Sequence, residues 1–532
     1  MNNDNLENFN EEINECTARG ACTIAPNIAA LQELVMYFIK QTAFYLLKLE
    51  KLGANNPSIK TEIINDLSAL IFVNEFNEEQ IFTIAMKGYF LLQNTKQTYK
   101  KLNNSTNSLE LKNKINFNNN TNLAKAISYG ENLLRQKYNN IQNEKKHLID
   151  VLEIVIKSTC LHLAKLNDIG IFEDFTFYII LKALNEFNHN RITAKIVEKY
   201  TSKLAELDND LILKISKVLT DKYGDIEKTA VSYSTEKGKA ILVSGSNFTE
   251  LEGLLKQSKN QNVDVYTHSE LLLANTLPEF KKYPQLKGHY GDKTENNILD
   301  FATFPGAILL TKNSKRNSEY LYRGRLFSSG YIVPKGVIKI ENNDYSEVIK
   351  SAKSAKGFKT GKNKPAVDLG YNKENIIKKF DILKLKMQTK EIKRLFIIGM
   401  NTYSEYQKEY FKNFFKLINE DEFVISFMDT KEKTNILPIN LGNFTPFVTE
   451  VLHCLFEKIP ITQDNIYIFF TNCDVMTISN TITLKSHHAK NIYMADCPPT
   501  SINPAVLKTL KQEYDIKNTT TPEEDIKRIR QI

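Results

Sequence analysis

The chain has 532 residues, of which 42% are apolar and 25% charged, and its formal net charge is +8. These values are ordinary for a soluble globular protein with several cores, roughly three domains at ~150–200 residues each. They exclude nucleic acid or an acidic membrane as the main partner, because no Lys/Arg cluster is dense enough for either.

The sequence shows neither a membrane-spanning segment nor a secretory signal, so a cytoplasmic protein is expected. No apolar run approaches the ~18–20 residues of a membrane-spanning helix. The amino terminus, MNNDNLENFNEEINE, is acidic and does not resemble a secretory signal. Six cysteines in so long a chain do not make a disulfide framework, so a reducing compartment is expected.

The amino-terminal part of the chain is predicted to be helical. Apolar residues follow one face of a helix from Ile28 to Leu49 at three- and four-residue steps, and Asn27 precedes them as a candidate cap. Two further helices are predicted over 148–166 and 174–187. This region therefore reads as a helical bundle.

The pattern changes near residue 238, where short apolar runs begin to alternate with amphipathic helical stretches. Runs of this length, rich in β-branched and aromatic residues, are typical of parallel sheets covered by helices. The runs are KAILVSG, VDVYTH, GAILLT and GVIKI and, after a Gly/Lys-rich link, RLFIIGM, EFVISFM, NIYIFFT and NIYMA. The predicted fold class is α plus α/β, with a helical-bundle domain over 1–236 and two Rossmann-like parallel α/β domains over 237–375 and 376–532.

Reactive side chains in parallel sheets lie just past the carboxyl ends of the strands, where loops gather around a crevice. Six positions meet that description: Ser246, Glu270, Ser314, Asn401, Asp429 and Asp474. We therefore expect a site in a crevice between the two α/β domains. The serines and histidines show no recognisable Ser-His-Asp spacing, and there is no Gly-rich phosphate loop.

Seven motifs follow one another along the chain. They are CTARGAC at 16–22, AALQ at 29–32, VYTHSE at 265–270, YPQLKGHYG at 283–291, FATFPG at 301–306, YRGRLFSSG at 322–330 and SINPAVL at 501–507. In content, order and spacing they resemble the motifs of hybrid cluster proteins, the prismane or hydroxylamine reductase family. The family's V-Y-T-H-G-E has a glycine where this chain has Ser269.

The resemblance implies two metal centres, a [4Fe-4S] cubane held by four amino-terminal cysteines and a hybrid Fe-S-O cluster. The hybrid cluster takes four cysteines, two glutamates and one histidine. By position, Cys16 and Cys22 remain from the cubane set, and its upstream C-x-x-C pair has no counterpart. The two glutamates fall on Glu270 and Asp474. The histidine falls on Ser246, and the four cysteines fall on Ser314, Asn401, near Asp429 and near Phe444.

Hydroxyl, amide and phenyl groups do not replace the thiolates that bind iron-sulfur clusters. The resemblance therefore predicts a member without the hybrid cluster and, by default, without a cofactor. A single metal ion remains an alternative if His268, Glu270 and Asp474 converge, since these are ligands for Fe(II), Mn or Zn. Otherwise His268 and Glu270 are expected to be held by backbone or arginine partners left from the ancestral site.

The cysteines leave further alternatives open. Cys16 and Cys22 are interpreted as free thiols, but two such thiols can also form a redox pair or bind half a cubane that is shared across a homodimer axis. Cys473 and Cys497 can replace a lost ligand, although packing is the ordinary explanation for Cys473. Cys160 and Cys454 lie on apolar helical faces, where a small buried side chain is usual.

Three functions follow from these residues. The first is a non-catalytic family member that binds or regulates an unidentified protein partner. The second is a reductase of the hydroxylamine or nitric oxide type with an electron donor and a cluster held in an unpredicted way. The third is a different metal-dependent enzyme built on Glu270 and Asp474. The replaced thiolates favour the first, because sites rather than folds determine chemistry.

Overall fold

The structure is a computed structural model of the chain. It describes residues 24–54, 56–71, 76–103, 115–139, 141, 145–188, 192–291, 297–312, 324–333, 336–400, 405–442, 444–495 and 505–531. Five residues singled out in the sequence lie outside the described residues: Cys16, Cys22, Ser314, Asn401 and Cys497.

The residues group into two compact units, which we describe one at a time. The helix-rich unit comprises Met1–Leu211, Cys473–His487 and Cys497–Ile516. The sheet-rich unit comprises Ile212–Asn472, His488–Asp496 and Lys517–Ile532. The predicted domain boundaries after residues 236 and 375 stay a prediction. The predicted fold class, a helical region followed by two parallel α/β sheets, is confirmed.

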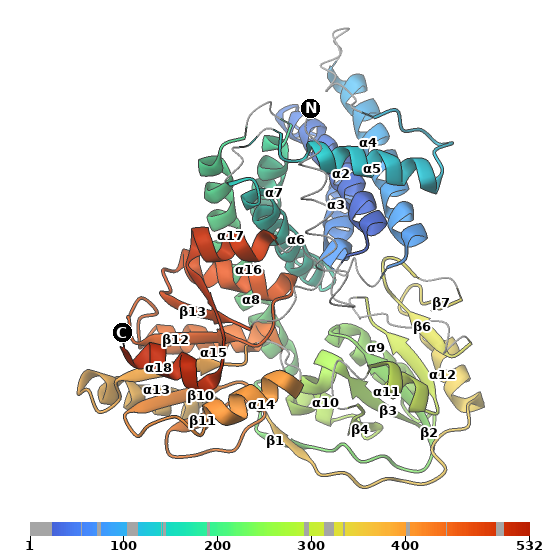
Figure 1. The fold of residues 1–532 in the computed structure, drawn as a ribbon. Coiled ribbons are helices and arrows are strands. Elements are labelled where there is room, and N and C mark those ends of the chain that lie inside the picture. Colours follow the sequence, from blue (N-terminus) through green and yellow to red (C-terminus); the bar gives the residue numbers. More distant parts are fainter. Residues whose placement is uncertain are drawn as a thin grey trace. The chain divides into compact units, whose positions relative to one another are not determined.

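The first part of the chain is helical, as predicted (Figure 1). Its helices are α2 Pro26–Lys51, α3 Pro57–Ala69, α4 Glu78–Asn103, α5 Leu123–Gln136, α6 Leu148–Asn167, α7 Asp174–Glu186 and α8 Ala194–Tyr223. Helix α2 packs on α4, α5 and α7, and α3 packs on α6. Their apolar faces form the core of the helix-rich unit.

Asn27 does not cap α2, so this prediction was wrong. The helix begins two residues earlier than predicted, with Pro26 in the first turn and Ala25 at the N-cap position. Proline suits that place because its fixed φ matches the helix and its missing N–H would have had no intrahelical partner. The Asn27 side chain instead donates from Nδ2 to Glu78 Oε1 at 2.8 Å.

Two helices from the carboxyl-terminal part of the chain complete the helix-rich unit. Helices α16 Val475–Ser486 and α17 Ala505–Tyr514 pack on α6 (Figure 1). Asp208 of α8, which is fully buried, links α6 to α16. Asp208 accepts hydrogen bonds from Ser158 of α6 at 2.9 Å and Ser479 of α16 at 3.3 Å, and His162 Nδ1 lies 2.7 Å from its other oxygen.

The first sheet of the sheet-rich unit has six parallel strands in the order β4-β3-β2-β5-β6-β7. The strands are β2 Lys239–Ser244, β3 Val263–His268, β4 Leu286–His289, β5 Ala307–Leu310, β6 Leu326–Ser328 and β7 Ile338–Lys339. The connecting helices are α9 Phe248–Ser258, η3 Ser269–Thr276, α10 Pro278–Lys281, α11 Asn297–Thr303 and α12 Ser346–Ser354. The central strands β2, β3 and β5 are mostly apolar and buried because both faces are covered.

The second sheet has the order β11-β10-β9-β12-β13-β14, with parallel pairing from β11 to β13. Its strands are β9 Arg394–Ile398, β10 Glu422–Ser426, β11 Ile436–Pro438, β12 Ile466–Phe470, β13 Asn491–Met494 and β14 Ile516–Asn518. The remaining helices are α13 Lys373–Gln388, α14 Glu405–Phe414, α15 Thr445–Phe456 and α18 Pro522–Gln531. Aromatic rings of this sheet, including Phe396, Phe469 and Tyr493, form a buried core with the helices that cover it.

A small antiparallel pair, β1 Thr229–Val231 and β8 Val367–Leu369, lies outside the two large sheets. Across the part of the chain that the structure describes, no helix combines the length and the apolar character needed to cross a membrane.

Candidate functional site

The carboxyl-terminal edge of the first sheet carries a hydrogen-bonded chain of side chains. Ser244 and His268 are the last residues of β2 and β3 and are paired across the parallel ladder. This register brings Ser244 Oγ within 2.9 Å of His268 Nδ1. The other ring nitrogen, Nε2, lies 3.4 Å from Asp300 Oδ2 of α11.

A second histidine stands beside this chain. The rings of His268 and His289 are stacked, with centroids 6.1 Å apart. His289 Nδ1 lies 3.0 Å from Thr267 Oγ1, which also accepts a hydrogen bond from Asn275 at 2.9 Å. Burial, together with the neighbouring His268, holds the pKa of His289 well below its usual range, so His289 is neutral at physiological pH.

Gly291 closes the site from one side and cannot be replaced without displacement. Its φ is +99°, which L side chains rarely adopt. A Cβ atom there would lie 2.5 Å from Asp300 Oδ2 and 2.8 Å from His268 Cδ2. The glycine therefore allows the backbone to approach the His268–Asp300 pair closely.

Ser244, His268 and Asp300 are the residue types of a hydrolase triad, but their geometry differs from one. In that triad the serine bonds Nε2 and the aspartate bonds Nδ1 of the histidine, whereas here the two ring nitrogens are exchanged. Ser244 is also only 2% exposed, so its hydroxyl is not presented to a substrate. The chain of contacts fixes the ring of His268 rather than activating a nucleophile.

Glu270, the predicted ligand next to this cluster, is half-buried in the first turn of η3. Within the described residues its side chain makes no hydrogen bond or ion pair. The residue before it, Ser269, has a φ of +60°. A non-glycine residue with such a φ is strained by about 1 kcal/mol. The family motif V-Y-T-H-G-E has a glycine at the position of Ser269.

Three other predicted positions in the sheet-rich unit are not gathered around Glu270 by any described contact. Ser246 is half-buried in the loop between β2 and α9, and Asp429 is exposed beyond the end of β10. Phe444 is 1% exposed and precedes α15. Its ring packs edge-on against Phe248, with centroids 5.1 Å apart, and so fills an aromatic core.

Asp474 belongs to the helix-rich unit, where it caps α16. Its side chain accepts a hydrogen bond from the Thr477 backbone N–H at 2.8 Å, which satisfies one of the free N–H groups of the first turn. The neighbouring Cys473 is 2% exposed and is not in a disulfide. Asp474 therefore has a structural role that requires no metal.

Replacing Asp474 by alanine is expected to lower the free energy of unfolding by about 1 kcal/mol, because the cap is lost. Asparagine has a side-chain oxygen at the same place, so the Asp474→Asn variant is expected to stay within about 0.5 kcal/mol of the original protein. Urea denaturation of the three proteins measures both values. Equal midpoints for the alanine variant and the original would contradict the capping role.

The side chains at the described positions do not match the ligand set of a hybrid cluster. Ser246 presents a hydroxyl, Asp429 an exposed carboxylate and Phe444 a packed phenyl ring, whereas iron-sulfur clusters need thiolates. Across the residues whose positions are described, no three His, Cys, Asp or Glu side chains are gathered closely enough to hold a metal ion.

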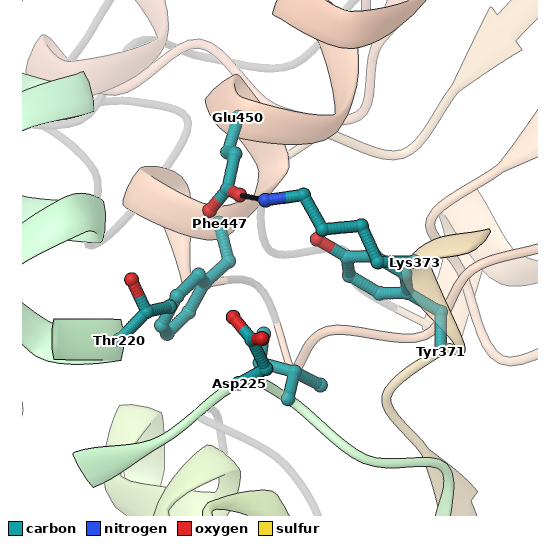
Figure 2. A pocket seen from close by; sticks show the side chains of 7 residues that line it. Thr220, Asp225, Tyr371, Lys373, Phe447 and Glu450 are labelled. Atoms are coloured by element: carbon teal, nitrogen blue, oxygen red, sulfur yellow. Dashed lines mark hydrogen bonds and ion pairs between the residues drawn. The ribbon is translucent and has the colours of Figure 1, made fainter. Parts of the chain in front are cut away.

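A small pocket lined by both polar and apolar side chains lies elsewhere in the sheet-rich unit, between the end of α8, the start of α13 and α15. Its volume is about 10 Å³, which is room for roughly one water molecule. Figure 2 shows Lys373 pointing at Glu450, and the two are 2.7 Å apart. Lys373 already neutralises Glu450, and the pocket is too small for a substrate.

Comparison with known proteins agrees with the motifs. The family model described as "Prismane/CO dehydrogenase family" matches residues 12–427. Relatives named hydroxylamine reductase include those of Syntrophobacter fumaroxidans, 24% identical with 97% of each chain covered, and Thermodesulfovibrio yellowstonii, 25% identical with 97% of this chain and 98% of the relative covered. A third, from Clostridium novyi, is 26% identical with 96% of each covered. The matched residues span most of the chain, which therefore belongs to the Prismane/CO dehydrogenase family.

Proposed function

We propose that this protein has the fold of its hydroxylamine reductase relatives but has lost the hybrid cluster, and that it acts by binding or regulating a protein partner. The observation that supports this most is Phe444. The resemblance places a cluster cysteine near this residue, and its ring is packed into an aromatic core with Phe248. A phenyl group offers iron no lone pair, and a core position offers it no space.

His268 and Asp474 have contacts that need no metal. His268 is held between Ser244 and Asp300, and Asp474 caps a helix. These contacts support a role of both side chains in the fold. Glu270 differs, since it is half-buried and makes no bond within the described residues.

Anaerobic purification tests the proposal. The protein is expressed with iron and sulfide supplied, and iron, acid-labile sulfide and visible absorption are measured beside the relative from Clostridium novyi. We expect much less than one iron per chain, no brown colour and no hydroxylamine reduction with a reduced viologen as donor. The relative controls for cluster loss during handling.

Two other outcomes would each contradict the proposal. Several irons per chain with sulfide, together with hydroxylamine reduction, would support a retained reductase and would direct attention to Cys16, Cys22, Cys473 and Cys497. One stoichiometric metal without sulfide would support a different metal enzyme. In that case Glu270→Gln should release the metal, because a neutral amide is a weaker ligand than a carboxylate.

A further inference from the structure

The helix-rich unit contains a buried cluster of six charged side chains: Glu33 and Lys40 of α2, Lys137 at the end of α5, and Asp150, Glu153 and Lys157 of α6. Lys137 Nζ lies 2.7 Å from Glu153, 2.8 Å from Asp150 and 3.2 Å from Glu33. Lys40 Nζ lies 2.7 Å from Glu153 and 3.2 Å from Glu33. Lys40 and Lys137 therefore form ion pairs with all three carboxylates.

Lys157 is the exception in this buried charge cluster. It follows Glu153 by one turn of α6 and is 6% exposed. Within the described part of the chain it forms no ion pair or hydrogen bond, since Glu33, Asp150 and Glu153 are all bound by Lys40 and Lys137. A buried ammonium group without a partner is unfavourable unless it gives up its proton.

The charged groups near Lys157 can be named helix by helix. The charges that act on it most are Glu153, Lys137, Glu33 and Asp150. Helix α3 contributes one buried carboxylate, Asp66, and α8 contributes another, Asp208, which is bound to Ser158 and His162. The buried residues of α16 and α17 are all uncharged. With every group ionised the cluster has three positive and three negative charges, so the proton on Lys157 sets its net charge.

We propose that Lys157 is a proton-exchanging site in the core of the helix-rich unit, and that its loss of a proton in mildly alkaline solution tightens the packing of α6 against the rest of this unit. Lysine in this position acts as a pH-sensitive element of the fold. The proposal does not depend on whether a cluster is bound, because none of the six residues is a predicted ligand.

The direction of the effect follows from proton linkage. Burial, and secondarily the charge of Lys137, lowers the pKa of Lys157 to about 8, although the three carboxylates oppose this. In the unfolded chain a lysine has a pKa of about 10.4. Between these values the unfolded chain binds more protons than the folded one, so the free energy of unfolding rises with pH. Below pH 8 both states are protonated and the rise is absent.

The test compares the full-length protein with its Lys157→Met variant in thermal unfolding at pH 7, 8, 9 and 10. Methionine has a similar length and no charge, so the variant is expected to unfold about 3 °C above the original at pH 7. This difference should shrink from pH 8 upward and be nearly absent at pH 10. Titration of the folded proteins should show one additional proton released by the original, with a midpoint near pH 8.

Two controls isolate the charge. In Lys157→Arg the charge persists at every pH, so its midpoint should stay below that of the methionine variant throughout. Lys101 is an exposed lysine of α4, and Lys101→Met should change neither the midpoint nor its pH dependence. A methionine variant that is unfolded or less stable at pH 7, or a difference that is constant from pH 7 to 10, would overturn the proposal. Each result is independent of the iron analysis.

Discussion

Replacing Lys137 by methionine is expected to lower the free energy of unfolding by about 3–5 kcal/mol, the usual effect of removing one member of a buried ion pair. Lys137 touches Glu33, Asp150 and Glu153 at once. Without it, three buried carboxylates would share one paired ammonium, Lys40, and the poorly placed Lys157. Urea denaturation at neutral pH measures the loss.

The exposed Lys101→Met variant provides the reference for the loss of any lysine. A decrease below about 1 kcal/mol for Lys137→Met would show that the carboxylates find other partners or water, as exposed ion pairs do. The same replacement at two places in this core, Lys137→Met and Lys157→Met, is thus expected to change the free energy of unfolding in opposite directions. Their contrast separates a paired buried charge from an unpaired one.

The same cluster gives the protein a defined acid sensitivity. Burial opposes ionisation of Glu153, but the charges of Lys137 and Lys40 outweigh it and lower its pKa to about 2. An unfolded glutamate has a pKa of about 4.3. The stability contributed by Glu153 is therefore fully present above about pH 4.3 and is lost as the pH falls toward 2.

Replacing Gly130 by alanine is expected to lower the free energy of unfolding by about 3 kcal/mol or more, at the upper end for overpacked cores. Gly130 lies on the face of α5 that touches α2. A Cβ atom there would be 2.0 Å from the carbonyl oxygen of Ala30 and 2.4 Å from its carbonyl carbon. Backbone atoms cannot rotate away, so the two helices must separate.

Gly88 of α4 is a matched control, because it is also a buried helical glycine against α2. A Cβ atom at Gly88 would be 3.4 Å from Phe38 Cβ, close to ordinary contact. Alanine at that position gains helix propensity of about 0.5–1 kcal/mol, so Gly88→Ala should be close to neutral. Similar destabilisation of both variants in urea would show that the contact with Ala30 is not the cause.

The long apolar strands could be predicted from the sequence, whereas four of the short strands could not. Runs such as KAILVSG and NIYIFFT form β2 and β12, because a strand buried on both faces needs several consecutive apolar residues. Strands β4, β6, β11 and β14 have three or four residues each. Their apolar residues are too few, or too mixed with polar ones, to be distinguished from a loop.

The candidate site was predictable in place but not in its contacts. Rules for parallel sheets point to the ends of β2 and β3, where the Ser244–His268 contact lies. Sequence reasoning missed Ser244, Asp300 and His289 as partners, because register and loop paths decide which side chains meet. It also missed the capping role of Asp474, which depends on α16 beginning at the next residue.

Helix α16 has a consequence for how the chain is made. The hydrogen bond between Asp208 and Ser479 cannot form until Ser479 is synthesised, 271 residues after Asp208. The helices encoded first therefore cannot complete their core while the ribosome is still translating, although domains usually fold in order of synthesis. Until the last part of the chain emerges, the apolar face of α6 that α16 and α17 cover stays open to aggregation or to a chaperone.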